Sequence, residues 1–220
     1  MHALCSFSGG KDSCLALWRA QLQGYDVRAL LVMFEESGER SRSHALPLSL
    51  LSKQADALNL ELVTRQASWS SYEAQFTSAL REFRSRNFST AIFGDIDLQP
   101  HRDWEEKVCA SANIEPVLPL WHQDRRELAL QVIDAGFRAV VVCIDSRYLG
   151  DEFCGREYDA AFIADLPEDV DACGENGEFH TFVYDGPNFS QPVPFAIEGF
   201  EPYVAPAEFG GTRYVFAKLR

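Results

Sequence analysis

Along residues 1–148, short apolar runs alternate with segments in which apolar residues recur at helical spacing. The runs are nearly continuous, which is typical of strands in a parallel sheet that is covered on both faces. After a shorter run at 3–5, they occupy residues 25–34, 60–64, 90–93, 114–118 and 137–144. With helices between them, they predict a three-layer α/β fold around a mostly parallel sheet of five or six strands.

The segments between the runs have the pattern of amphipathic helices. Residues 47–58 begin with a proline, which favours the first turn of a helix, and place their leucines on one side. Residues 70–86 and 125–135 show the same periodicity, and Gly136 is a typical residue to follow a helix end. The order of strands and helices therefore predicts repeated βα units.

After Tyr148 this alternation stops, and we predict a boundary there. The expected division is an α/β domain at 1–148 and a small α+β C-terminal subdomain at 149–220, with a helix near 156–164. The end of the chain is rich in prolines and aromatic residues and predicts a small antiparallel hairpin whose best strand is 214–219. This hairpin or a sheet edge could pair two chains, so a homodimer is a hypothesis.

The segment SFSGGKDS, residues 6–13, lies between the first apolar run and an apolar helix. A strand, two glycines, a lysine and hydroxyls before a helix form the arrangement in which backbone N–H groups bind a phosphate. A Walker A loop has a different spacing, because here a lysine is followed by an acid. The alternative is an ordinary glycine-rich turn with a capping side chain. We predict an anion site at Ser8, Gly9, Gly10, Lys11, Asp12 and Ser13.

A second polar group follows the run at 90–93. Gly94 and Asp95 come directly after this strand. Because ligands bind beyond the carboxyl ends of the strands in doubly wound sheets, both residues should lie near the 6–13 loop. Arg102, slightly further on, could bind a phosphate or a carboxylate through its guanidinium. The alternative role for Arg102 is a surface salt bridge to Glu105 or Glu106, about one helical turn further on.

The third polar group is GENGEFHT, residues 174–181. Alternation along an extended segment puts Glu178 and His180 on one face, opposite Phe179 and Thr181. The alternative is a glycine-rich turn that opens an exposed strand, with the acids solvated. His44 is a loop histidine before the 47–58 helix, and such residues more often face solvent than act in a site.

Composition limits the partners and the compartment. The chain has 220 residues, 46% of them hydrophobic, so it can bury a full core. Its net charge of −13, with basic residues clustered only at 81–86, argues against a nucleic-acid partner. Neither an apolar run of about eighteen residues nor a targeting pattern is evident. The six cysteines lack CxxC spacing and predict reduced, mostly buried thiols in a cytoplasmic protein without a zinc site.

Taken together, these motifs resemble those of one enzyme family. SGGKDS looks like the PP-loop of the N-type ATP pyrophosphatases, which have a HUP-like fold. In the same order follow GDI at 94–96, PLW at 119–121 and CGENGEFHTFVYDGP at 173–187. This set resembles the diphthine–ammonia ligase family over nearly the whole chain, and the last motif is the family-specific one.

The resemblance implies roles for the residues above. ATP would lie with its polyphosphate on the 8–13 loop and its base near the main chain of Met33 and Phe34, with Gly94 and Asp95 close by. Asp12 would help to hold Mg²⁺. The resemblance implies catalytic roles for Lys11, Asp12, Glu178 and His180. It implies substrate contacts from His44, Arg102, Glu175, Asn176 and Thr181.

The chemistry implied is ATP-dependent amide formation through an acyl-adenylate, with release of AMP and pyrophosphate and with ammonia as nucleophile. The carboxylate would be diphthine on elongation factor 2, or a smaller molecule if the source lacks diphthamide. A PP-loop enzyme of tRNA modification is one alternative, which the acidic composition and cysteine spacing disfavour. An ATP-binding module of the universal stress protein type is another, but such modules lack a GENGEFHT-like segment.

Overall fold

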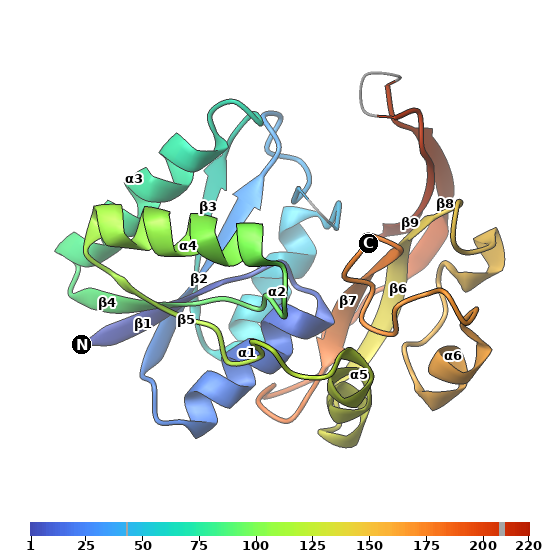
Figure 1. Cartoon of the computed structure of the whole chain (residues 1–220), viewed down its shortest axis with the longest axis horizontal. Helices are drawn as coiled ribbons and strands as arrows, with labels where there is room; N and C mark the ends of the chain where they lie inside the picture. The colour runs from blue at the N-terminus through green and yellow to red at the C-terminus, as the bar shows by residue number, and fades with distance from the viewer. Residues whose placement is uncertain (43, 207–209) are drawn as a thin grey trace.

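The computed structural model describes residues 1–42, 44–206 and 210–220. Ser43, which belongs to the polar segment between the second predicted strand and its helix, lies outside the described residues. Within them the chain forms two sheets (Figure 1). The first is built from β1 (His2–Ser6), β2 (Val27–Phe34), β3 (Glu61–Gln66), β4 (Phe88–Ile92) and β5 (Glu115–Val117).

This first sheet is entirely parallel and has the order β3-β2-β1-β4-β5. The chain order reverses between β1 and β4, so a crevice opens at the carboxyl ends of these two strands. The sheet confirms the predicted α/β class and its mostly parallel strands. It also fixes the edge at which a ligand can be bound.

Four helices cover the two faces of the sheet. Strand β2 is continuously apolar because its side chains point into a hydrophobic core on each face. Leu30 and Val32 face a core shared with two of the helices, whereas Leu31 and Met33 face the other core. Both faces of the strand are therefore buried, as its pattern predicted. The helices are α1 (Lys11–Leu22) and α2 (Leu48–Leu58) on one face, and α3 (Tyr72–Ser85) and α4 (Gln99–Ala112) on the other.

The second sheet is antiparallel, with the order β7-β6-β9-β8. Its strands are β6 (Arg138–Asp145), β7 (Phe179–Asp185), β8 (Ile197–Val204) and β9 (Arg213–Leu219). Strands β8 and β9 form the predicted hairpin, which extends away from the α/β layers in Figure 1. The remaining helices are α5 (Arg125–Asp134), the 3₁₀ turn η1 (Asp151–Phe153) and α6 (Ala160–Asp165).

The position of β6 differs from the prediction. Its apolar run fits a parallel strand, but it pairs antiparallel with β7 and β9 instead of extending the first sheet. The run is continuous because residues on both faces of β6 are buried in the common core. The boundary between the sheets thus precedes β6, and the division of the chain at residue 148 stays a prediction about domains.

The expected helix near 156–164 is shorter than predicted. The start of the predicted helix is instead extended and hydrogen-bonded to β6. Val141 N–H donates to the Arg156 carbonyl, and Tyr158 N–H donates to the Ala139 carbonyl, both at 2.8 Å. The helix therefore begins only at Ala160, where Asp159 caps it by accepting from Phe162 N–H at 2.8 Å. All six cysteines are buried, and within the described residues none forms a disulfide. None of the helices in these residues has the length and apolar character needed to span a bilayer.

Candidate functional site

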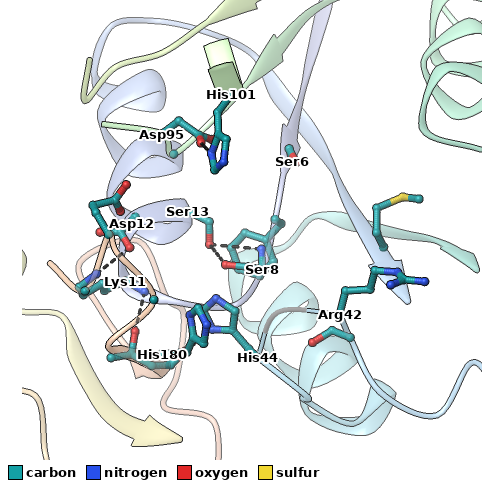
Figure 2. Close-up of a pocket in the computed structure, with 18 of the residues that line it drawn as sticks. Ser6, Ser8, Lys11, Asp12, Ser13, Arg42, His44, Asp95, His101 and His180 are labelled. Carbon is teal, nitrogen blue, oxygen red and sulfur yellow. Dashed lines mark hydrogen bonds and ion pairs between the residues drawn. The ribbon is translucent and has the colours of Figure 1, made fainter. Parts of the chain in front are cut away.

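A cavity of about 310 Å³ lies at the carboxyl edge of the first sheet. It is bounded by the segments that follow β1, β2 and β4 and, from the other side, by the start of β7 and the glycine-rich segment before it. Figure 2 shows side chains from all these segments turned toward a common space. The fold therefore brings together three polar groups that are far apart in the sequence.

The 6–13 loop forms the floor of this cavity. Gly9 has φ = +81°, a left-handed conformation that favours glycine. The two hydroxyls stabilise the loop internally: Ser13 Oγ donates to the Gly10 carbonyl at 3.0 Å, and Ser8 Oγ lies 3.2 Å from Ser13 Oγ. The N-cap residue of α1 is Gly10, which has no side chain to accept from the first N–H groups of the helix. The start of α1 can therefore receive an anion, which the helix dipole favours.

Strand β7 is hydrogen-bonded to the 6–13 loop. Thr181 Oγ1 accepts from Lys11 N–H at 3.1 Å, and Val183 N–H donates to the Gly9 carbonyl at 2.9 Å. Buried Gln54 from α2 bridges the two, since its Nε2 donates to the carbonyls of Gly9 and Val183 at 3.0 and 2.6 Å. The GENGEFHT motif and the 6–13 loop, which the sequence predicts to bind phosphate and which is called the phosphate loop below, are therefore in direct contact. Sequence order gives no sign of this contact.

The side chain of Lys11 is buried, with only 3% of the residue exposed. Its ammonium donates to Asp12 Oδ2 at 2.6 Å and to the Cys173 carbonyl, and lies 5.7 Å from the centroid of the Phe179 ring. Burial lowers the pKa of Lys11, but Asp12 and the other acidic groups around the ammonium together outweigh burial, and the net pKa is raised. Lys11 is therefore a fixed positive charge at the loop.

Gly94 and Asp95 lie beside the first turn of α1. A Cβ atom at Gly94 would lie 3.0 Å from the carbonyl carbon of Asp12 and 3.0 Å from the nitrogen of Ser13. Glycine is thus required for the close approach of two backbones. Asp95 accepts from His101 Nδ1 at 2.7 Å. Burial raises the pKa of Asp95, but this hydrogen bond, a second one with Glu105 and the charge of His101 together lower it.

Acidic side chains gather around the same space. Asp12, Asp95 and Glu175 all line the cavity. Burial raises the pKa of Glu175 to about 7, and the charges of Asp12 and Asp95 add to this effect. Burial also raises the pKa of Asp12, with Lys11 opposing the shift. A surplus of carboxylates in a half-buried cavity favours a cation close to them.

His44 and His180 form a ring pair on the opposite wall. Their centroids are 4.7 Å apart, and His44 Nδ1 donates to the Thr181 carbonyl at 2.8 Å. Burial lowers the pKa of His44 to about 4, with the charge of Lys11 adding to it. Burial, His44 and Lys11 together hold the pKa of His180 well below its usual value. Both imidazoles are therefore neutral at physiological pH.

Six predicted site residues do not line the cavity: Gly9, Gly10, Phe34, Arg102, Asn176 and Glu178. Glu178 is 1% exposed and points into its own loop, where it accepts from the main-chain N–H of Asp171 at 3.2 Å and that of Asn176 at 2.9 Å. The Asn176 amide also donates to Glu178, at 2.9 Å. Arg102 lies on the exposed side of α4, with its Nε 2.7 Å from Glu106. Phe34 is buried in the core, and its carbonyl accepts from Ala67 N–H.

Arg42, His101 and Tyr72 are among the lining residues that were missing from the predicted site. Arg42 lies in the polar segment after β2, and its main-chain N–H donates to the Met33 carbonyl at 3.1 Å. His101 and Tyr72 come from the starts of α4 and α3. The sequence offered a signal only for His101, which lies a few residues beyond the GDI motif. Arg42 and Tyr72 reach the cavity only because β2 and β3 end at the same edge.

Comparison with known proteins places these motifs in a family. Residues 1–116 match the model of the diphthamide synthase N-terminal domain, and residues 124–198 match that of the diphthamide synthase C-terminal domain. Diphthine–ammonia ligases of Mus musculus and Homo sapiens are each 22% identical to the chain, over 88% of this chain and 82% of theirs. The diphthine–ammonia ligase of Schizosaccharomyces pombe is 24% identical over 88% of this chain and 36% of its own length.

Among solved structures, a predicted subunit of tRNA methyltransferase from Methanocaldococcus jannaschii superposes with a TM-score of 0.44 and 17% identity. The match covers 64% of this chain and 80% of that one. The family matches confirm the resemblance drawn from the four motifs.

Proposed function

Since the chain belongs to the diphthamide synthase family, and is thus a C–N bond-forming ligase of the ATP-dependent amidation type, we propose that it activates its carboxylic acid as an acyl-adenylate. The observation that supports this best is the direct contact between the phosphate loop and β7. Because Thr181 holds the loop and His180 lines the same cavity, nucleotide activation and attack by the nucleophile would take place in one space.

In the first step, a carboxylate oxygen of the substrate attacks the α-phosphorus of ATP. The bond from this phosphorus to the bridging oxygen breaks, and pyrophosphate leaves with the electron pair. The first turn of α1 and the Lys11 ammonium would stabilise the leaving group, because both are fixed positive features that need no rearrangement. Positioning and charge stabilisation are the main contributions expected of the protein here.

In the second step, the nitrogen of ammonia attacks the acyl carbon and the bond to the AMP oxygen breaks. The products are the amide, AMP and one proton. Ammonium must lose a proton before it can attack, and Glu175 has the best-matched basicity in the cavity, with a pKa of about 7. Neutral His180 is a weak base with its low pKa, and we assign it the role of accepting an N–H from the nucleophile.

Asp12 and Asp95 fit a magnesium ion bound together with ATP. Within the described residues no group of three or more His, Cys, Asp or Glu side chains is arranged to hold a metal alone. Magnesium in nucleotide sites typically takes one or two carboxylates and completes its coordination with phosphates and water. When bound, it would neutralise the charge on the polyphosphate.

The carboxylic acid is either diphthine on elongation factor 2, as in the names of the relatives, or a smaller molecule. The test is to incubate the protein with ATP, Mg²⁺, ammonium and diphthine-bearing elongation factor 2, and to separate the nucleotides by chromatography. Formation of AMP and pyrophosphate with a one-to-one gain of ¹⁵N in the product supports the proposal. Formation of ADP and phosphate contradicts it.

Hydroxylamine separates the two steps, because it is largely unprotonated at neutral pH and needs no base. A Glu175→Gln variant should lose amide formation from ammonium and still form the hydroxamate. A Lys11→Ala variant should lose both products. Equal loss of both products in Glu175→Gln would exclude the role assigned to Glu175.

A further inference from the structure

A second cavity, of about 520 Å³, lies beside the first, between the segment that follows β2 and the inner face of the second sheet. The two cavities share Ser41, Arg42 and His180 as lining residues, so these form the wall between them. In Figure 2, Arg42 and His180 border the space around the phosphate loop from the side away from Asp95. Nothing in the proposed reaction so far uses this second space.

The inner face of the sheet gives the second cavity its chemical character. Cross-strand pairing places His180 beside Cys143, Cys143 beside Phe216, and Phe216 beside Glu201. These residues form one row on the same face, because directly paired residues in a sheet point the same way. Tyr203 pairs with Tyr214 in the adjacent row, and both line the cavity. One side of the cavity is therefore built from aromatic rings.

The opposite side carries Trp69, which is 72% exposed, and Arg42. The Arg42 guanidinium lies 4.3 Å from the centre of the Trp69 ring and donates to the Ala67 carbonyl. Its Nε is buried and has no hydrogen-bond partner among the described residues. A buried, unpartnered donor on a cation costs free energy unless a ligand supplies an acceptor.

Two of the other charges in the second cavity neutralise each other, because Arg40 lies 3.6 Å from Glu201. Glu35 keeps its negative charge, and its carboxylate accepts from the Ser37 hydroxyl at 2.9 Å. Within the described residues Arg42 has no carboxylate in salt-bridge contact. The cation without such a partner is thus the one at the wall of the nucleotide cavity. A carboxylate that binds Arg42 lies next to that cavity, with the remainder of its molecule among the aromatic rings.

We propose that the second cavity binds the substrate whose carboxylate is activated, and that this substrate is a carboxylic acid on a bulky apolar or aromatic body. Arg42 pairs with the carboxylate at the wall between the cavities, and Tyr203, Tyr214 and Phe216 contact the body. This inference rests on the proposed function, because it requires a nucleotide in the first cavity. It goes beyond that function by locating the acyl group and its chemical class.

The test uses 5′-O-(N-acylsulfamoyl)adenosines, which are stable mimics of an acyl-adenylate. Dissociation constants are measured by calorimetry for 5′-O-sulfamoyladenosine and for its N-acetyl and N-(4-phenylbutanoyl) derivatives. Burial of a phenyl ring should make the phenylbutanoyl compound bind about tenfold to a hundredfold tighter than the acetyl compound. Tyr203→Ala and Phe216→Ala should reduce this ratio to about threefold or less and leave the affinity for sulfamoyladenosine unchanged.

Phe200→Ala is the matched control. Phe200 is an aromatic residue of the same strand as Tyr203 and is 55% exposed, but it does not line the cavity. This variant should keep the full ratio. Equal affinity of the wild type for the acetyl and phenylbutanoyl compounds, or an equal loss in Phe200→Ala and Tyr203→Ala, would overturn the assignment of the cavity. Failure of sulfamoyladenosine itself to bind would instead refute the proposed function, and this inference with it.

Discussion

Replacing Gly94 by alanine tests whether the close approach of β4 to the phosphate loop sets the position of the nucleotide. The added Cβ would meet the Asp12 carbonyl carbon and the Ser13 nitrogen at 3.0 Å each. Both atoms are main chain, so no rotamer change can relieve the contact. The first turn of α1 must move by a few tenths of an ångström, or β4 must move away from it.

The expected cost follows from two opposing effects. Overpacking by one methyl group costs about 1–3 kcal/mol. Alanine also restricts the unfolded chain, which stabilises the protein by about 0.4–1 kcal/mol where the backbone conformation allows it. The φ angle of Gly94 is not in the left-handed region, so this gain applies. The net expectation is a loss of roughly 1–2 kcal/mol of unfolding free energy.

Gly199→Ala is the control, because its Cβ would meet no atom within 4 Å and its φ is also outside the left-handed region. Only the unfolded-state effect remains there, and stability should be unchanged or slightly higher. Stability is measured from the midpoint of urea unfolding, and nucleotide affinity by calorimetry with a non-hydrolysable ATP analogue. Gly94→Ala should also bind the analogue about tenfold more weakly, since the helix N-terminus has moved. Equal stability and equal affinity in the two variants would refute the reasoning.

Four further predictions concern other contacts of the site. Thr181→Val should lower the unfolding free energy by about 1–3 kcal/mol, because it leaves the buried Lys11 N–H without an acceptor. Thr181→Ser should retain most of the stability, and urea unfolding of both variants measures the difference. Glu178→Gln should lower the unfolding free energy by about 2–3 kcal/mol, because the carboxylate accepts three hydrogen bonds inside its loop; an unchanged melting curve with lost activity would point to a catalytic role instead. Arg102→Ala should change the rate of AMP formation less than twofold and stability by about 0.3–0.5 kcal/mol, since its pair with Glu106 is exposed; a large rise in KM for the acid would restore the substrate role. The pKa of Glu175 is raised from 4.5 to about 7 by burial and by Asp12, so the folded state binds more protons in this interval, and wild-type stability should fall relative to Glu175→Gln as pH rises from 4.5 to 7; parallel stability curves would contradict this.

Several features of the site could be predicted from the sequence because they depend on residues close together in the chain. The spacing of SGGKDS after a strand and before a helix predicts an anion site wherever the strand lies. Asp95 was predicted at the same edge because parallel strands present their carboxyl ends together. Asp12 and Asp95 both line the cavity. His44 reaches the cavity as well, and its partner there is the Thr181 carbonyl.

Other features depend on which strands become neighbours, and sequence patterns do not encode this. The apolar run of β6 fits a central parallel strand equally well, so its antiparallel pairing could not be read from periodicity. Alternation put Glu178 on the face of His180, but Glu178 precedes β7 and its carboxylate turns back to satisfy the main-chain N–H groups of its own loop. Period-two reasoning holds only inside a strand.

The sequence by itself determined the fold class, the glycine-rich turn at 6–13 and the family, because each rests on short segments whose residues act on their neighbours in the chain. Only the tertiary structure decided that β7 supports the loop through Thr181 and Val183, and that Arg42 separates two cavities. Those contacts join segments far apart in the chain. Their geometry follows from how two sheets pack around one core, since packing fixes distances that no local pattern specifies.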